Sequence, residues 1–193
     1  MKDLPKQTIL DLIDNACATP KEKRVTYRGN TIVVVMASWN EEGKVFPCVT
    51  AVPRDIVDTV VVVNNGSSDN TEKEAIDAGA VCISHPRNIG AGGGYRSGYL
   101  YGLRHNFDLI VELAGDNQDD PADIVCVVDH LIDGKYDYVH GSRWINAGTA
   151  INITSSRTVL TKVYSLIFRS FFGNNITDAT NGFRAFKSSI LED

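Results

Sequence analysis

Short runs of apolar, mostly β-branched residues alternate with segments of helical length, and this alternation constrains the fold more than any other feature. The runs occupy residues 31–37, 57–63, 80–84, 109–113 and 136–140. Runs this short and this rich in Val or Ile are typical of strands buried on both faces. The pattern therefore predicts an α/β fold with a mostly parallel sheet flanked by helices.

The segments between the runs predict the helices. One is expected after Asp69, where Glu72 three residues later resembles the acid of a capping box. Others are expected over residues 91–104 and 121–131.

The first 30 residues precede the alternating strand and helix segments and do not share their pattern. Ile9, Leu10, Ile13 and Ala16 recur at helical spacing before a charged stretch. Residues 1–30 are therefore expected to be an N-terminal helical extension that packs on a domain of residues 31–193. No terminal signal marks Asp193 as a natural end, so a C-terminally truncated domain stays open.

Composition excludes several classes of protein. The net charge of −5 gives no broad basic surface for nucleic acid. No secretory signal is expected at the N-terminus, because no apolar run follows its charged residues, and no run reaches the roughly 18 apolar residues that span a bilayer. The cysteines lack metal-ligand spacing and are interpreted as buried or neutral thiols in a reducing compartment, at Cys17, Cys48, Cys82 and Cys126.

Polar motifs follow the predicted strands, where parallel sheets bind their ligands. Residues 37–42, Ala-Ser-Trp-Asn-Glu-Glu, offer an aromatic ring and carboxylates to a base, although Asn and Glu are also common at helix starts. Residues 63–71 contain Gly66, which allows close backbone approach to a ligand, among polar side chains that also suit a simple turn.

A glycine-rich segment follows the third run. It covers residues 87–98 and leads into a predicted helix, whose amino end would favour phosphate. Arg87 and Arg96 could add positive charge, and the spacing is neither a P-loop nor a dinucleotide fingerprint.

The most informative motif follows the fourth run, at residues 113–121. Three acids and two amides directly after a buried strand are costly unless a positive group lies among them. Their oxygen atoms suit Mg²⁺ or Mn²⁺. Asp120 is explained as the start of the helix at Pro121, Asp119 stays open, and Asp116 is left without a structural explanation.

The last part of the chain carries further polar motifs at residues 140–144 and 177–186, with Arg157 between them. Residues 158–172 show an apolar face at helical spacing. This segment is interpreted as a core helix, with a helix lying on a membrane surface as the alternative.

Taken in order, these segments resemble family-2 glycosyltransferases, specifically the dolichyl-phosphate mannosyltransferase-like branch, over about residues 31–191. The matching segments are Asn40-Glu41-Glu42, Asn65-Gly66-Ser67, the Asn88 glycine loop, Asp116-x-Gln118, Gly141-Ser142-Arg143 and Asp178-x-x-Asn181-Gly182-Phe183-Arg184. The resemblance implies a GT-A type nucleotide-binding fold, with residues 31–193 as the catalytic domain.

The resemblance also assigns roles to individual residues. The nucleotide-binding residues would be Ala37, Trp39, Glu41, Asn64, Gly66, Asn88 and Gly90. Asp116 and Gln118 would hold Mg²⁺ or Mn²⁺ on the donor diphosphate, and the catalytic set would be Asp116 with the phosphate-neutralising pair Arg143 and Arg157.

The implied reaction is inverting transfer of a sugar from a nucleotide-diphosphate sugar to a polyprenyl (dolichyl-type) phosphate. An acceptor phosphate is already an anion and needs no protein base, whereas a hydroxyl acceptor would need a late carboxylate that the sequence does not obviously supply. Transfer to a sugar or protein hydroxyl and a non-catalytic nucleotide-sugar-binding domain are the alternatives. The expected location is the cytoplasmic face of a membrane, held peripherally or by a segment beyond residue 193.

Two departures from the family pattern bear on the site. Asn64-Asn65 stands where the family usually has Asp-Asp, which is expected to change base preference because an amide also donates hydrogen bonds. Ala114 stands where an Asp is usual, which removes one metal ligand that Asp119 or water would have to replace.

Overall fold

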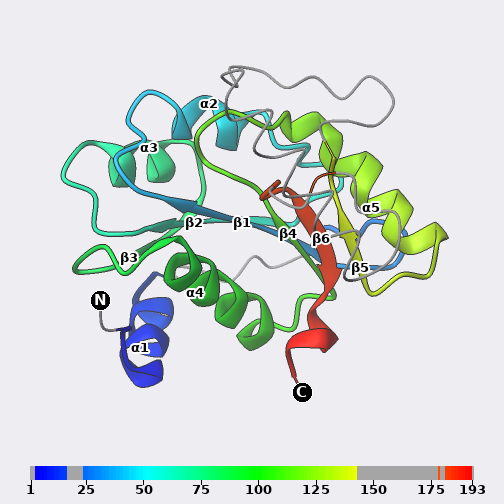
Figure 1. Cartoon of the computed structure of the whole chain (residues 1–193), viewed down its shortest axis with the longest axis horizontal. Helices are drawn as coiled ribbons and strands as arrows, with labels where there is room; N and C mark the ends of the chain where they lie inside the picture. Colours follow the sequence, from blue (N-terminus) through cyan, green and yellow to red (C-terminus); the bar gives the residue numbers. More distant parts are fainter. Residues whose placement is uncertain (1–2, 17–23, 143–177, 179–180, 193) are drawn as a thin grey trace.

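A computed structural model describes residues 3–16, 24–142, 178 and 181–192. Its centre is a six-stranded sheet with the strand order β3-β2-β1-β4-β6-β5 (Figure 1). The strands are β1 (Ile32–Ser38), β2 (Thr59–Asn64), β3 (Val81–Ser84), β4 (Leu109–Glu112), β5 (Tyr138–His140) and β6 (Arg184–Lys187). The first four strands are mutually parallel, and β6 runs antiparallel to both β4 and β5. The predicted mostly parallel sheet is confirmed.

Helices cover both faces of the sheet (Figure 1). They are α1 (Lys6–Ala16), α2 (Val45–Thr50), α3 (Thr71–Asp77), α4 (Ala91–Arg104), α5 (Ile124–Asp133) and the 3₁₀ turns η1 (Pro121–Asp123) and η2 (Ser188–Leu191). Helices α2, α3 and α5 lie on one face, and α1 and α4 lie on the other. No helix in the described part of the chain is long and apolar enough to cross a membrane.

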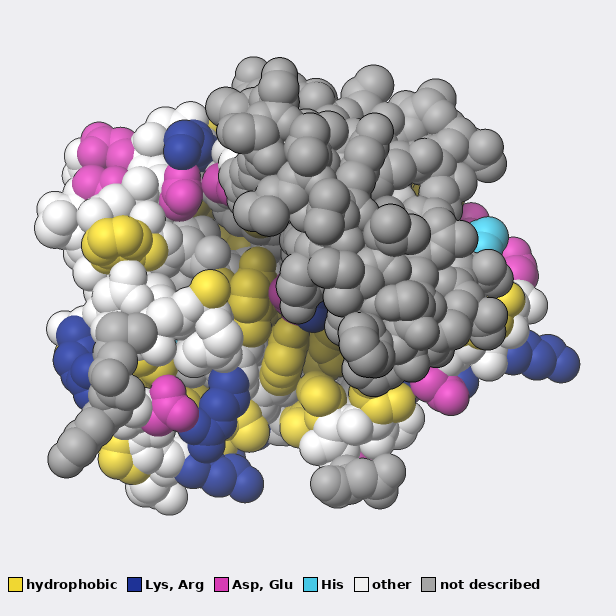
Figure 2. Space-filling model, in the orientation of Figure 1, with side chains coloured by type: hydrophobic (Ala, Val, Ile, Leu, Met, Phe, Trp, Pro, Cys, Tyr) yellow, Lys and Arg dark blue, Asp and Glu magenta, His cyan; other side chains and the backbone are white. Residues whose placement is uncertain are grey.

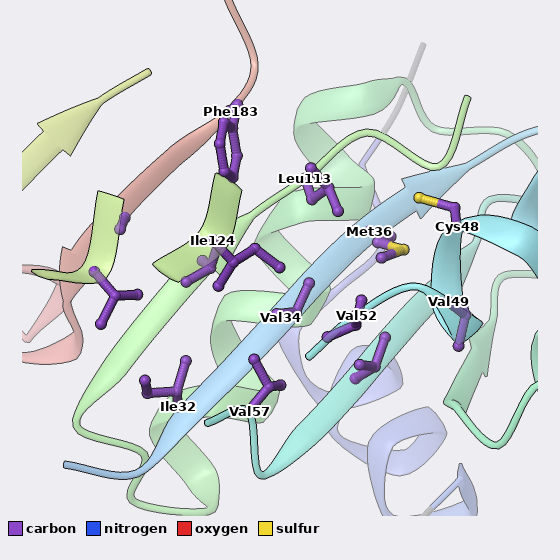
Figure 3. Close-up of a cluster of buried hydrophobic side chains, with 14 of the residues drawn as sticks. Ile32, Val34, Met36, Cys48, Val49, Val52, Val57, Leu113, Ile124 and Phe183 are labelled. Atoms are coloured by element: carbon purple, nitrogen blue, oxygen red, sulfur yellow. The ribbon is translucent and has the colours of Figure 1, made fainter. Parts of the chain in front are cut away.

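Each face of the sheet has its own buried core, because alternate side chains of a strand point to opposite faces. On the face that carries α2 and α5, Ile32, Val34 and Met36 of β1 pack with Cys48 of α2 and Ile124 of α5 (Figure 3). On the opposite face, the intervening valines of β1 and β2 pack against α1 and α4. The continuous apolar runs of the sequence therefore reflect burial on both sides.

Helix α1 is part of the second core. Ile9 and Ile13, four residues apart, are fully buried there, and Arg104 of α4 forms an ion pair with Asp14 at 2.8 Å. The N-terminal segment thus packs on the domain through the face that its periodicity predicts.

The glycines of α4 have a structural role that the sequence prediction did not include. Gly94, Gly98 and Gly102 are buried and recur at four-residue spacing along one side of α4. A Cβ at Gly98 would overlap the side chain of Val35, and one at Gly94 would lie 2.9 Å from Cβ of Ala37. The small residues therefore let α4 lie directly against β1.

Some local predictions were incomplete or wrong. Strand β6 and helix α2 were not predicted, and β2 and β5 begin two residues later than the apolar runs, at Thr59 and Tyr138. The capping box before α3 is not formed. The Asp69 carboxylate accepts from the amide of Thr71 at 3.0 Å, while the Glu72 carboxylate lies 3.4 Å from the side-chain amide of Asn64. The segment 158–172, predicted as a helix, lies outside the described residues.

The thiols are free in the described part of the chain, and Cys17 lies outside it. Burial raises the pKa of Cys48 to about 12 and that of Cys82 to about 11, so both thiols are neutral at physiological pH, as predicted. Cys126 is exposed on α5.

Candidate active site

The polar motifs meet at one edge of the sheet. Strands β2, β1 and β4 are neighbours and parallel, so the segments that follow them leave the sheet side by side. This brings residues 37–42, 64–69 and 113–118 together, as the sequence predicts.

The loops after β1 and β2 are joined by reciprocal hydrogen bonds. The amide of Asn40 donates to Oγ of Ser67, and the amide of Ser68 donates to Oδ1 of Asn40, both at 3.0 Å. The amide of Glu41 donates to Oγ1 of Thr71 at 2.9 Å. These bonds fix the loop that carries Trp39.

The side chains of Trp39 and Glu41 differ in how free they are to contact a ligand. The indole of Trp39 is 54% exposed, so a face of it is available for stacking on a base. The Glu41 carboxylate accepts from Nζ of Lys44 at 2.7 Å. Ala37, at the end of β1, is half-buried and faces Gly94 of α4.

Asn64 turns inward rather than toward open space. It is 4% exposed, and its Oδ1 accepts from the amide of Ser67 at 3.0 Å. Its Nδ2 donates to Oγ of Ser84 at 3.2 Å. The contact with a nucleoside that we predicted for Asn64 remains a prediction, and most of its hydrogen-bonding capacity is used within the protein.

Gly66 is required by the protein's own packing. It has a φ of 72°, and a Cβ there would lie 2.5 Å from the backbone carbon of Arg87. In the structure Gly66 closely approaches the backbone at Arg87 and Asn88, and the predicted approach to a ligand remains a prediction.

The glycine segment leads into the amino end of α4 as predicted. Gly90 has a φ of 88° and directly precedes the helix, and its amide donates to Oδ1 of Asn88 at 2.8 Å. The amino end of a helix of this length carries unpaired amides and a positive partial charge. Arg96 on α4 lies 3.8 Å from the Asp3 carboxylate.

The segment after β4 forms a turn. Oδ1 of Asp116 accepts from the amide of Gln118 at 3.1 Å, and Asn117 has a φ of 62°. The Asp120 carboxylate accepts from the amide of Ala122 at 2.9 Å and begins η1, which confirms that Asp120 starts a helix. Asp116, Gln118 and Asp119 stay half-buried.

The residues of this turn fit a divalent ion held largely by its substrate. The described residues contain no cluster of three or more His, Cys, Asp or Glu side chains that could hold a metal alone. Asp116 and Gln118 supply oxygen atoms, which suits Mg²⁺ or Mn²⁺ bound through one or two protein ligands and phosphates. Asp116 and Asp119 both add to the effect of burial in raising the pKa of Cys48, so both carboxylates lie on the side of this thiol.

A buried hydroxyl next to the turn has no hydrogen-bond partner among the described residues. Oγ of Ser38 is buried at the end of β1 and makes no hydrogen bond with any described residue. A Cβ on Gly115 would collide with it, so the hydroxyl lies directly beside the backbone that precedes Asp116. Buried polar atoms are normally paired, so the arrangement fits a polar ligand at this turn.

The two late motifs are tied together through Asn181. Its Nδ2 donates to the carbonyl of Gly141 at 3.2 Å, and its own carbonyl accepts from Nε2 of His140 at 2.6 Å. The amide of Gly141 donates to the carbonyl of Phe183 at 2.9 Å. The structure therefore brings residues 141–142 next to residues 181–184, while Arg143 and Arg157 lie outside the described residues.

A buried acid that the sequence analysis missed lies between β4 and α4. Glu112 is 3% exposed and opposite Arg184 in the register of β4 and β6. The hydroxyl of Tyr99 donates to its carboxylate, and Nε of Arg184 lies 3.7 Å away. Tyr99 also packs edge-on against Phe186, and Figure 2 shows hydrophobic side chains in the hollow beside α4. The only signal in the sequence was an acid inside an apolar run.

The charge of Glu112 is expected to make stability depend on pH. Burial raises its pKa above the ordinary value of 4.5, although Tyr99 and Arg184 act in the opposite direction. The folded state then holds the proton more tightly than the unfolded state, so this contribution to stability is complete below 4.5 and is lost as pH rises through the raised pKa. Urea denaturation measures the unfolding free energies of the wild type and of Glu112→Gln. We expect the wild-type value minus the variant value to decrease as the pH is raised from 4 to 7. A rising difference would mean that the pairing with Arg184 outweighs burial.

Comparison with known proteins agrees with this architecture. The profile described as "Glycosyl transferase family 2" matches residues 33–193. Polyprenol monophosphomannose synthase of Mycolicibacterium smegmatis is 32% identical over 139 residues, which cover 69% of this chain and 52% of that protein. Undecaprenyl-phosphate mannosyltransferase of Micrococcus luteus is 30% identical over 137 residues, 68% of this chain and 56% of that protein. The chain thus spans about half the length of these relatives.

Solved structures support the fold. Glucosyl-3-phosphoglycerate synthase from Mycobacterium tuberculosis, in complex with Mn²⁺, UDP-glucose and phosphoglyceric acid, matches with a TM-score of 0.66 at 23% identity. The match covers 97% of this chain and 63% of that chain. The fold is therefore of the predicted GT-A type, and the names of the relatives agree with the dolichyl-phosphate mannosyltransferase-like branch. The chain belongs to glycosyl transferase family 2.

Proposed function

We propose that this chain is a metal-dependent, inverting glycosyltransferase that moves a sugar from a nucleotide-diphosphate sugar to a polyprenyl phosphate. The observation that carries the proposal is the Asp116 turn, placed beside the end of β1 at the edge where the nucleotide motifs meet. The relatives named for polyprenol and undecaprenyl-phosphate mannose transfer support the acceptor class.

The donor would lie across the ends of β1, β2 and β4. Trp39 would stack on the base, with Ala37, Glu41, Asn64 and Gly66 around the nucleoside. The amino end of α4, preceded by Asn88 and Gly90, would face the diphosphate with its backbone amides.

Asp116 and Gln118 would hold Mg²⁺ or Mn²⁺ against that diphosphate. When bound, the ion neutralises charge on the departing nucleoside diphosphate. Asp119 lies in the same turn and can compensate for the acid missing at Ala114. Arg143 and Arg157 would neutralise the phosphates of donor and acceptor.

The chemical step needs no protein base in this scheme. An oxygen of the acceptor phosphate attacks the anomeric carbon, and the bond from that carbon to the diphosphate oxygen breaks. The electron pair leaves with the nucleoside diphosphate, and the new sugar phosphate bond forms on the opposite face of the ring. Such an acceptor would place the protein at the cytoplasmic face of a membrane.

A comparison of sugar transfer to two matched acceptors tests the acceptor class. We expect labelled sugar from a nucleotide-sugar panel to reach a short-chain polyprenyl phosphate in the presence of Mn²⁺, and not the matching polyprenol, which differs only in lacking the phosphate. Transfer to sugar or peptide hydroxyls instead would contradict the proposed acceptor. Nucleotide binding without transfer to any acceptor would favour a binding domain.

A further inference from the structure

A buried hydrogen-bond cluster joins the ends of β2 and β3 to α4. Its members are Asn65, which is 3% exposed, His85, which is 4% exposed, and Ser97, which is fully buried. Asn65 follows β2, His85 follows β3, and Ser97 lies on the buried side of α4. The cluster lies directly under the turn of residues 88–90 that leads into the helix.

The side-chain amide of Asn65 uses both its oxygen and its nitrogen. Oδ1 accepts from the amide of Ile89 at 3.1 Å and lies 3.0 Å from Nδ1 of His85. Nδ2 donates to the carbonyl of Gly90 at 3.0 Å and to Oδ1 of Asn88 at 3.2 Å. The backbone partners fix the orientation of the amide, because an N–H only donates and a carbonyl only accepts.

The ring of His85 takes its tautomer from these neighbours. Because Oδ1 of Asn65 accepts, Nδ1 of His85 carries the proton, and Nε2 accepts from the hydroxyl of Ser97 at 2.8 Å. Oγ of Ser97 is also 3.3 Å from the carbonyl of Gly93, within the first turn of α4. Bonds therefore run from the end of β2 through the imidazole to the helix.

An aspartate in place of Asn65 would lose both hydrogen bonds that the amide nitrogen donates. A carboxylate would face the carbonyl of Gly90 and Oδ1 of Asn88 with no proton to donate. Leaving such buried acceptors opposite a charge is costly. The amide that departs from the usual family pattern is thus the group that ties the 88–90 turn to the sheet.

We propose that Asn65, His85 and Ser97 are positioning residues that hold the 88–90 turn and the first turn of α4 in the geometry that receives the donor diphosphate. They act through the backbone of that turn and not by contact with the base. The inference rests on the proposed function for the identity of the ligand. It predicts that damage to the cluster weakens diphosphate recognition selectively.

The test compares Asn65→Asp with Asn15→Asp, which makes the same change on the exposed side of α1. We expect Asn65→Asp to lower the affinity for a nucleoside diphosphate with Mn²⁺ by about tenfold or more, equivalent to one buried hydrogen bond. The affinity for the corresponding nucleoside should stay within about twofold in both variants. Ser97→Ala, which removes only a hydroxyl, should show a smaller loss of the same kind. Equal losses for nucleoside and diphosphate, or no loss in either cluster variant, would overturn the proposal.

A second measurement does not depend on any nucleotide. In the free protein, hydrogen exchange of the amides of residues 89–94 should be about tenfold faster in Asn65→Asp than in Asn15→Asp, because the turn loses its ties. Unchanged exchange in these amides contradicts the positioning role. If the exchange changes but the wild type binds no nucleoside diphosphate, the proposed function fails while the structural role stands.

Discussion

Replacing Asp116 with alanine is expected to lower metal-dependent sugar transfer by about 100-fold or more, while the protein stays folded. Asp116 is the metal-binding carboxylate that we propose at this turn, and Ala114 removes the second acid of the usual pattern, so that only Asp119 could compensate. Loss of Asp116 would leave only Gln118, with Asp119 of the same turn, to hold the ion. The charge on the leaving diphosphate would then lose a stabilisation of several kcal/mol.

The matched control is Asp120→Asn in the same segment. Asp120 caps η1 through the amide of Ala122, and asparagine can accept the same bond. Transfer should stay within about twofold of the wild type, since Asn is nearly as good a cap. Initial rates at varied Mn²⁺ give both results. A greater loss in Asp120→Asn than in Asp116→Ala would reverse the assignment of the two carboxylates.

Replacing Gly98 with valine is expected to lower the free energy of unfolding by about 3 kcal/mol, as overpacking of a filled core does. A Cβ at this position already overlaps the side chain of Val35 in β1, and valine adds two methyl groups. Val35 is fully buried in a central strand. Neither its side chain nor the new valine at position 98 can therefore move aside without shifting α4 from the sheet.

Gly92 on the same helix provides the control. A Cβ at Gly92 meets no atom within 4 Å, so Gly92→Val should change stability by no more than about 0.5 kcal/mol. Urea denaturation of the two variants measures the difference directly. Equal effects would show that the glycines serve backbone conformation rather than the contact between α4 and β1.

The sequence predicts most of the sheet well because each of these strands is marked by a local run of apolar residues. Burial on both faces leaves unbroken apolar runs, and the helix predicted over residues 91–104 runs from Ala91 to Arg104. Strand β6 has no such signal. It is four residues long, and its place between β4 and β5 depends on antiparallel pairing with segments far away in the chain.

The candidate site was predicted at the level of motifs rather than of side-chain direction. The edge at which residues 37–42, 64–69 and 113–118 meet follows from parallel topology alone. Whether Asn64 points inward, or which backbone Gly66 approaches, depends on the packing of loops that are distant in sequence. Glu112 was missed for the same reason, because its partners Tyr99 and Arg184 come from a different helix and strand.

The departures from the family pattern have different consequences in the structure. Asn65 is satisfied by four neighbours and belongs to the support of the glycine turn. In the proposed site, Ala114 leaves the turn with fewer acids, which would make metal binding depend mainly on Asp116 and on the substrate. We therefore expect weak metal binding to the free protein and tighter binding once a diphosphate is present.

Isothermal titration calorimetry of nucleoside diphosphates into the wild-type protein, with and without Mn²⁺, tests the central claim most directly. We expect at least one nucleoside diphosphate to bind with an affinity that rises about tenfold or more when Mn²⁺ is added, and we expect Asp116→Ala to remove this increase. Binding that is indifferent to Mn²⁺, or an increase that persists in Asp116→Ala, would contradict a metal and diphosphate site at this turn.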